Sequence, residues 1–73
     1  SIKRGTTYRI LGYQPSLNAA WRQKFWAMGM LPGAVVEVIR VAPMGDPVQI
    51  RTRRVSLAVR QRDLADIILE EIV

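Results

Sequence analysis

The 73-residue sequence contains neither cysteine nor histidine, and this absence limits how the chain can be stabilised. No disulfide can form, and zinc ribbons and iron–sulfur clusters lack their usual ligands. The fold must therefore depend on a hydrophobic core, and 49% hydrophobic residues can supply one for a single domain spanning residues 1–73. Histidine is also the commonest general base, so a histidine-based catalytic triad is excluded.

The N-terminal half is predicted to form one strand and one helix. Apolar and polar residues alternate over residues 6–13, which indicates a strand with one mostly buried face. Ser16 and Asn18 can both cap a helix, and we favour Asn18. Gly29 can adopt the left-handed conformation that ends a helix. Between these signals, apolar residues recur at helical spacing and predict one buried stripe: Leu17, Ala20, Trp21, Phe25 and Met28.

The second half is predicted to be mostly β-structure. Pro32 and Gly33 form the pair that a type II turn requires. The segment after them, residues 34–42, is rich in valine and isoleucine and is expected to be a central, well-buried strand. The remaining predicted elements are a hairpin tip over 43–47, strands over 48–53 and 55–60, a helical turn over 62–65 and a last strand over 67–73.

This order of elements predicts a mainly β fold. We expect a small, five-stranded, partly open β-barrel of the SH3-like kind, with one α-helix after the first strand and a short helical turn before the last. An OB-type barrel is the alternative, because the pattern of strands alone does not separate the two. The position of the helix and the length of the chain favour the SH3-like barrel.

Positive charge dominates most of the chain. Eleven lysine and arginine residues oppose six acidic residues, for a formal net charge of +5. Four of the acidic residues lie in the last eleven positions, so the first 62 residues carry all eleven positive charges against two negative ones. This excess favours an anionic partner: nucleic acid, phospholipid headgroups or an acidic protein surface. No uncharged run, including the one over 25–36, exceeds twelve residues, so we expect no membrane-spanning segment.

Several turn motifs in one order resemble a known family. The segments are Met28-Gly29-Met30-Leu31-Pro32-Gly33, the strand 36–41, Ala42-Pro43-Met44-Gly45-Asp46-Pro47 and Arg53-Arg54-Val55-Ser56-Leu57. Together they are similar to the ferrous iron transport protein A (FeoA) family, from about Tyr8 to the C-terminus. The resemblance implies a cytosolic SH3-like protein with no catalytic residues and no cofactor. Its implied partner is the membrane-embedded ferrous iron transporter, ferrous iron transport protein B, whose cytosolic part binds GTP.

The sequence does not favour an iron site in this chain. Ferrous iron sites use imidazole and carboxylate ligands, and the close acidic residues occur only as pairs, Asp63 with Asp66 and Glu70 with Glu71. The three methionines offer soft thioethers, which suit Cu(I) better than iron. We therefore expect no metal site and assign the methionines to packing or to protein contacts.

A protein-binding surface is the favoured site. Trp26 follows Leu17 by nine positions and so lies on the opposite face of the helix, which makes it a candidate interface residue unless another segment covers it. Met30 and Leu31 either plug one end of the barrel or join Trp26 and Met44 in an apolar rim. We expect the partner-binding residues to be Trp26, Met30, Leu31 and Met44, with Arg51, Arg53 and Arg54 as steering charges. Exposed apolar residues also permit self-association.

The run of arginines supports a rival function as a small basic RNA- or DNA-binding β-barrel. Five arginines fall within twelve residues, at positions 51, 53, 54, 60 and 62. Barrels of that class stack bases on aromatic side chains of the sheet, and these strands contain no phenylalanine, tyrosine or tryptophan. The commonest reason for such a run is a solvated strand face. A non-enzymatic adaptor of the ferrous iron transporter is therefore the favoured function.

Overall fold

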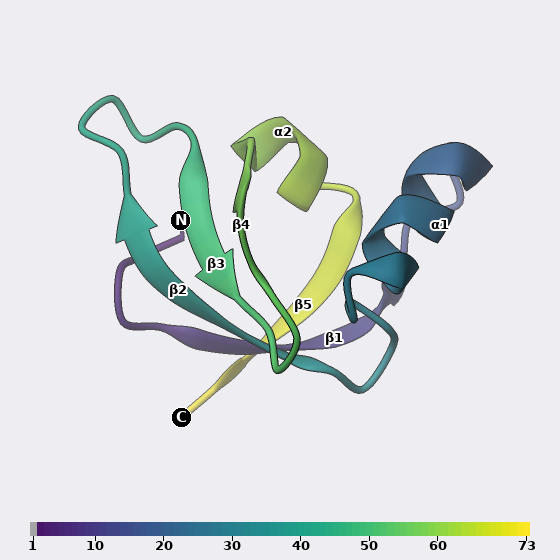
Figure 1. The fold of residues 1–73 in the computed structure, drawn as a ribbon, viewed down its shortest axis with the longest axis horizontal. Helices are drawn as coiled ribbons and strands as arrows, with labels where there is room; N and C mark the ends of the chain where they lie inside the picture. Colours follow the sequence, from purple (N-terminus) through teal and green to yellow (C-terminus); the bar gives the residue numbers. More distant parts are fainter. Residues whose placement is uncertain (1) are drawn as a thin grey trace.

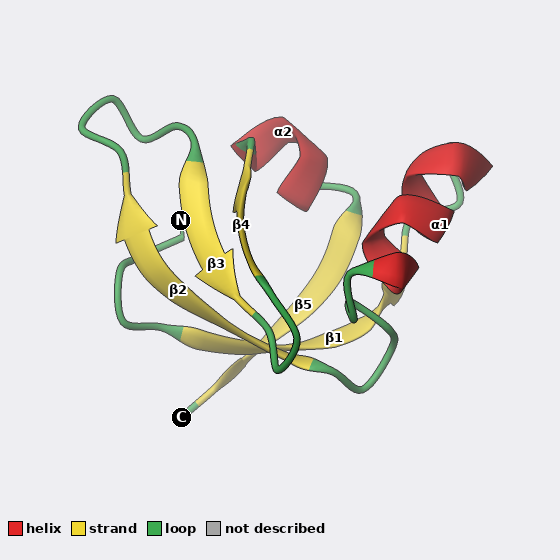
Figure 2. Ribbon diagram, in the orientation of Figure 1, coloured by secondary structure: helices red, strands yellow, loops and turns green. Residues whose placement is uncertain are grey.

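Alternating apolar residues and well-placed turn residues give the chain five strands and two helices. A computed structural model describes residues 2–73 (Figures 1 and 2). In chain order, the elements within these residues are β1 (Thr7–Tyr13), α1 (Ala19–Ala27), β2 (Val35–Val41), β3 (Val48–Arg51), β4 (Ser56–Val59), α2 (Gln61–Leu64) and β5 (Ile67–Ile72). All seven were predicted, with bounds that differ by a few residues.

The strands form one antiparallel sheet in the order β4-β3-β2-β1-β5. The sheet is curled and not closed, and α2 connects its two edge strands across the open side (Figure 1). This arrangement confirms a mainly β, partly open architecture with one helix after the first strand and a helical turn before the last. Because β1 pairs with β5, the first and last strands of the chain lie next to each other in the sheet.

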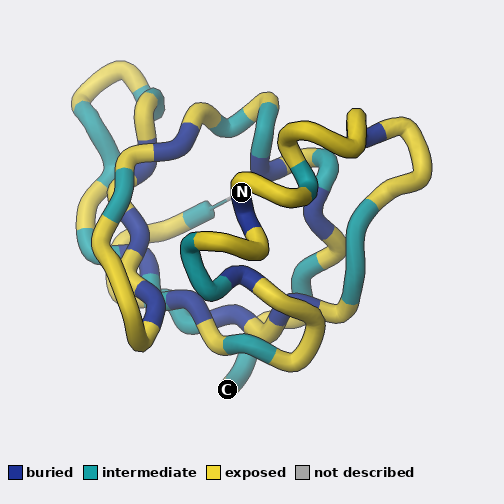
Figure 3. Tube along the Cα trace, turned by 45° about the vertical axis from the view of Figure 1, so that its right-hand side comes forward, coloured by how far each residue is buried: buried dark blue, intermediate teal, exposed yellow. Residues whose placement is uncertain are grey.

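The core lies inside the curve of the sheet, and buried positions alternate with exposed ones along the strands (Figure 3). In β3, for example, Val48 and Ile50 are buried and the residues between and after them are exposed, as the period of two predicts. The largest fully buried side chains are Phe25, Ile10, Met30, Ile50, Val36, Val38 and Val48.

The bounds of α1 follow from its caps. The Asn18 side-chain oxygen accepts hydrogen bonds from the amides of Ala20 (2.9 Å) and Trp21 (3.1 Å), which confirms the predicted N-cap. Gly29 ends the helix with a φ of +86°. Within residues 2–73, neither helix has both the length and the apolar character needed to cross a bilayer.

The buried stripe predicted for α1 is wrong in part. Phe25 is the one buried residue of the helix, and Leu17 is buried just before it. Ala20 and Trp21 are exposed, with 41% of the Trp21 surface accessible to solvent. The reason is position: α1 lies at one end of the sheet, so only a narrow face of the helix reaches the core (Figure 1).

The prediction for β2 is correct in its position and wrong in its burial. The strand is central, between β1 and β3, but only Val36 and Val38 are buried, and Val35 is 42% exposed. A single curled sheet buries one face of each strand, so a run of valines and isoleucines leaves half of them outside. The register with β3 also shifts between Val38 and Arg40, which marks a β-bulge at Ile39.

Tyr13 connects β1 to the segment after α1. Its hydroxyl donates a hydrogen bond to the Met30 carbonyl, and its ring stacks on Phe25 with centroids 6.1 Å apart. Burial raises the pKa of Tyr13 to about 12, because the charged phenolate is poorly solvated there. The neutral hydroxyl therefore remains a donor throughout the physiological pH range.

Candidate protein-docking surface

The apolar residues expected at a docking surface do not all lie together. Trp26 on α1 and Leu31 in the following turn are 42% and 47% exposed. Met30 between them is fully buried, which corrects the expectation that it contacts a partner. Its amide donates to the Phe25 carbonyl (3.0 Å) and its carbonyl accepts from Tyr13, so the backbone turns its side chain into the core. Met30 therefore belongs to the core, which agrees better with the alternative expectation that it plugs one end of the barrel.

Met44 is strongly exposed, at 92%, but it lies elsewhere. It is part of the hairpin tip that precedes β3, whereas the turn that carries Arg53 and Arg54 follows β3 at its other end (Figure 1). The tip is tied to α2, because the Gln61 amide donates to the Asp46 carboxylate (2.8 Å). A single apolar edge that includes Met44 with Trp26 and Leu31 therefore does not form.

The three arginines expected as steering charges differ in their surroundings. Arg51 is paired with Glu37 on the neighbouring strand, with 2.6 Å between its Nη2 atom and the Glu37 Oε1 atom. Arg53 and Arg54 lie in the β3–β4 turn, are exposed, and have no ion-pair partner among the acidic residues of the described chain. These two guanidinium groups are therefore free to contact an anionic partner.

A buried threonine fixes the β3–β4 turn against the end of α1. Thr52 is only 8% exposed, and its hydroxyl oxygen accepts from the amides of Arg54 and Val55, both at 3.2 Å. The same hydroxyl lies 3.2 Å from the Met28 carbonyl, to which it can donate. The link joins residues far apart in the sequence and sets the position of both arginines relative to the helix.

Arg54 also packs directly on the end of the helix. A Cβ atom placed on Gly29 would lie 3.1 Å from Cδ and 3.3 Å from Cγ of Arg54. The aliphatic part of the arginine therefore covers the glycine, and the positive φ at Gly29 would itself strain any other residue. Glycine at this position allows both the turn and the close approach of Arg54.

Two shallow hollows adjoin these residues. One, of about 350 Å³, is lined by the turn after α1 together with Val35 and Arg53. The other, of about 390 Å³, is lined by β1, β2 and β3 residues and again by Val35 and Arg53. We call the exposed residues from these adjoining segments the docking surface: Trp26, Leu31, Val35, Arg53 and Arg54.

Sequence reasoning missed three features of this region. Val35 was assigned to a buried strand and Trp21 to a buried stripe, and Thr52 was placed in the predicted strand over 48–53 with no role assigned. Trp21 instead covers Phe25, with ring centroids 5.7 Å apart, and lies beneath the Lys24 ammonium at 4.7 Å. For the role of Thr52, the one available signal was a polar residue at an inward position of a predicted alternating strand.

The described residues carry no evident metal-binding cluster. Among residues 2–73, no three aspartate or glutamate side chains gather in a group that could hold a metal ion. The acidic groups that form ion pairs use arginines as partners, at 3.9 Å for Arg9 with Glu70 and 3.7 Å for Arg60 with Asp46.

Comparison with known proteins places this geometry in one family. A family model described as the FeoA domain matches residues 1–71 of the chain. A Pseudomonas aeruginosa protein with a solution NMR structure is 44% identical, with a TM-score of 0.73 over 100% of this chain and 97% of that one. Iron(II) transport protein A from Clostridium thermocellum is 27% identical, with a TM-score of 0.86 over 97% of this chain and 43% of that one.

A more distant crystal structure identifies the fold type. FeoA from Stenotrophomonas maltophilia, solved as a complex with zinc, is 17% identical and gives a TM-score of 0.79 over 96% of this chain and 85% of that one. That protein is described as an SH3 domain protein and as a candidate ferrous iron transport activating factor. At this identity the likeness concerns the fold alone, and it confirms the expected SH3-like architecture.

Proposed function

Since the chain belongs to the FeoA domain family, we propose that it is a non-enzymatic adaptor that binds the membrane ferrous iron transporter, ferrous iron transport protein B, and regulates bacterial ferrous iron uptake. It works in the cytoplasm and reaches the inner membrane through this partner. The name of the Clostridium thermocellum relative and the description of the Stenotrophomonas maltophilia protein both refer to iron transport, which supports this proposal.

The observation that carries the proposal is the docking surface itself. Trp26, Leu31 and Val35 each leave more than two fifths of their surface in water, although all three are large apolar residues. Single exposed apolar residues are common, but here Val35 lines both hollows with Arg53, and Trp26 and Leu31 lie on either side of Gly29, on which Arg54 packs. Tryptophan and arginine are the residues most enriched where protein interfaces concentrate their binding energy.

The chemistry of this surface predicts the kind of segment that it binds. The apolar residues would be covered by apolar side chains of the partner, and Arg53 and Arg54 would meet acidic groups at the rim. Arginine can bind a carboxylate through two parallel hydrogen bonds, which fixes orientation as well as adding affinity. Charged rims mainly raise the rate of association and are screened by salt, so the apolar residues should supply most of the affinity.

A pull-down tests the proposal. The protein is immobilised and exposed to detergent-solubilised transporter or to its isolated GTP-binding domain, at low and moderate salt, with mixed RNA as a competitor. The proposal expects the transporter to be retained at moderate salt in the presence of RNA. The isolated domain then shows whether the cytosolic part is sufficient.

The same experiment distinguishes the nucleic-acid alternative. A basic RNA- or DNA-binding barrel would bind the competitor tightly, and its binding would weaken steeply as the salt concentration rises. The large exposed aromatic residues among positions 2–73, Trp21 and Trp26, lie on α1 and not on a strand, and this position does not favour base stacking on the sheet. Loss of the transporter together with salt-sensitive RNA binding would overturn the adaptor proposal.

A further inference from the structure

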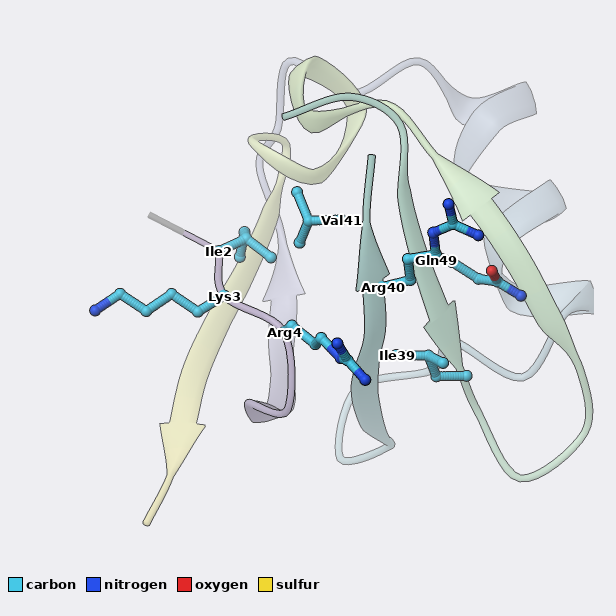
Figure 4. A pocket seen from close by; sticks show the side chains of 7 residues that line it. All are labelled: Ile2, Lys3, Arg4, Ile39, Arg40, Val41 and Gln49. Carbon is cyan, nitrogen blue, oxygen red and sulfur yellow. The ribbon is translucent and has the colours of Figure 1, made fainter. Parts of the chain in front are cut away.

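A second basic region lies at the other end of the molecule. An open groove of about 670 Å³ runs between the N-terminal segment and the outer face of β2 and β3 (Figure 4). Three of its lining residues are cationic: Lys3, Arg4 and Arg40. We call this site, including its three cations, the N-terminal groove.

The β-bulge in β2 builds the floor of this groove. Because the register shifts between Val38 and Arg40, Ile39 and Arg40 both oppose Gln49 on β3. All three residues line the groove, so the bulge brings an aliphatic and a cationic side chain to the same face. The N-terminal segment forms the wall and is fixed to β2 by the hydrogen bond from the Gly5 amide to the Val38 carbonyl (2.8 Å).

The charges in the groove are uncompensated within the described chain. Lys3, Arg4 and Arg40 are exposed and make no ion pair with an acidic residue of positions 2–73, and no acidic residue lines the groove. Glu71 lines a neighbouring hollow that shares Ile2, but it pairs with none of the three. Other arginines of the chain, such as Arg51, do have a carboxylate partner.

The cations are spread along the groove rather than directed at one point. In Figure 4, Arg4 extends from the N-terminal segment toward β2, whereas Lys3 points outward from the same segment. A single phosphate ion would need converging donors. An extended array of negative charges fits this spacing better, and the groove has no aromatic lining residue on which a nucleic-acid base could stack.

An exposed apolar tip adjoins the groove. Val41 lines the groove and ends β2, and Met44 follows it by three residues in the hairpin tip. Met44 is 92% exposed, while the rest of the tip is held by Asp46 and Gly45, which accept hydrogen bonds from Gln61. Exposed cations beside a protruding apolar side chain are the pattern of a surface that rests on an anionic membrane.

We propose that Lys3, Arg4, Arg40 and Met44 bind the anionic headgroup layer of a phospholipid bilayer. The docking surface lies at the opposite end of β3, so membrane contact leaves it accessible (Figure 1). The inference does not depend on the proposed function, because binding to lipid alone needs no transporter. Failure of one proposal can therefore be distinguished from failure of the other.

The test is co-sedimentation of the protein with vesicles. Vesicles of an equal mixture of phosphatidylglycerol and phosphatidylcholine are compared with vesicles of phosphatidylcholine alone. The wild-type protein is expected to bind only the anionic vesicles, and less at higher salt. Each basic residue near an anionic surface contributes on the order of a fivefold gain, so the combined Lys3→Gln, Arg4→Gln and Arg40→Gln variant should lose roughly a hundredfold in partition coefficient.

A matched variant separates this site from the effect of net charge. The combined Lys24→Gln, Arg53→Gln and Arg54→Gln variant loses the same formal charge from exposed positions outside both the groove and the tip. Salt screens charges that lie more than about 10 Å from the vesicle surface. The partition coefficient of this variant should therefore stay within about threefold of the wild-type value. Met44→Ser should lower binding about fivefold by removing apolar contact. Circular dichroism verifies that all three variants remain folded.

Three outcomes would overturn the proposal. The first is an equal loss of vesicle binding in the two triple variants, which would mean that net charge alone determines the binding. The second is no preference of the wild-type protein for anionic vesicles. The third is displacement from vesicles by inorganic phosphate at constant ionic strength, which would indicate a site for a single soluble anion.

Discussion

At the scale of single residues, Thr52 has the clearest effect on the candidate site. One buried hydroxyl accepts from two amides of the arginine turn and lies within hydrogen-bond distance of the Met28 carbonyl at the end of α1. Arg54, in turn, packs on Gly29. The position of the docking surface therefore depends on a side chain that contributes little to its exposed area.

Replacing this hydroxyl tests that dependence. Thr52→Val keeps the shape of the side chain but leaves two partly buried amides without their acceptor, so the free energy of unfolding should fall by about 1–3 kcal/mol. Thr52→Ser keeps the hydroxyl and should recover most of the loss. Urea denaturation of the three proteins measures both effects, and a Thr52→Val variant as stable as wild type would contradict the assigned role.

A second prediction concerns Tyr13 and the free energy of unfolding in alkaline solution. Burial raises its pKa to about 12, whereas a tyrosine in the unfolded chain titrates near 10. The unfolded state therefore loses its proton first, and the stability that neutral Tyr13 contributes is complete below about pH 10 and is lost as the pH rises toward 12.

Denaturation curves across this pH range check the prediction. The free energy of unfolding should fall more steeply with pH for the wild type than for Tyr13→Phe, which has no phenolic proton. Every other ionisable group is common to the two proteins, so its contribution cancels in the comparison. Parallel curves would show that the Tyr13 hydroxyl is no less solvated in the folded state than in the unfolded state.

The outcomes at Asn18, Trp21 and Met30 show what sequence can resolve at this scale. Asn18 was predictable because its capping hydrogen bonds are local. Helical spacing gives the direction of Trp21 around its helix, but whether another layer covers that direction depends on tertiary packing. Met30 was misplaced because one backbone turn after Gly29 decides between core and solvent, and residue type alone does not reveal that choice.

At the scale of elements, the end of α1 connects local structure to the docking surface. Gly29 and Gly33 both have positive φ values, of +86° and +91°, but only Gly29 has a side chain packed against it. Alanine at either position should cost about 1–2 kcal/mol of stability through backbone strain. Gly29→Ala should cost more than Gly33→Ala, because its methyl group also displaces Arg54.

Thermal unfolding of the two glycine variants measures the difference. Combining Gly29→Ala with Arg54→Ala removes the steric conflict and should bring the cost back toward that of Gly33→Ala. Equal midpoints for the two single variants would mean that Arg54 yields freely and does not cover the helix end.

The elements themselves were largely predictable, and their burial was less so. Turn residues such as Gly29, Pro32 and Gly33 act over a few positions, so they fixed where α1 ends and β2 begins. The burial of β2 was overestimated because a valine-rich segment is equally compatible with one or two covered faces. The bulge at Ile39 has no local sequence signal, since it arises from pairing with β3.

At the scale of the whole molecule, charge and topology separate two surfaces. The docking surface lies beyond one end of β3, and the tip with Met44 lies beyond the other (Figure 1). Under the two proposals, one end meets the transporter while the other rests on the lipid beside it. On the last strand, Glu70 pairs with Arg9, and Glu71 lines a hollow next to the N-terminal groove without pairing with its cations.

The strand order could not be predicted from the sequence with the same certainty as the strands. Pairing between β1 and β5 joins the two ends of the chain, from Thr7 with Ile72 to Tyr13 with Ile67. No turn motif specifies contacts over that distance. The family resemblance implied the SH3-like arrangement, whereas periodicity alone left an OB-type barrel open.

The central claim, that the docking surface binds the transporter, is tested most directly by comparing two tryptophans on one helix. Trp26 and Trp21 are nearly equally exposed, at 42% and 41%, but only Trp26 belongs to the docking surface. Affinity for the solubilised transporter is measured for the wild type and for Trp26→Ala and Trp21→Ala, with thermal midpoints as the control. We predict that Trp26→Ala weakens binding by about tenfold or more with little change in its midpoint, while Trp21→Ala binds like wild type. Equal affinities for the two variants, or a loss for Trp26→Ala that matches a loss of stability, would contradict the account.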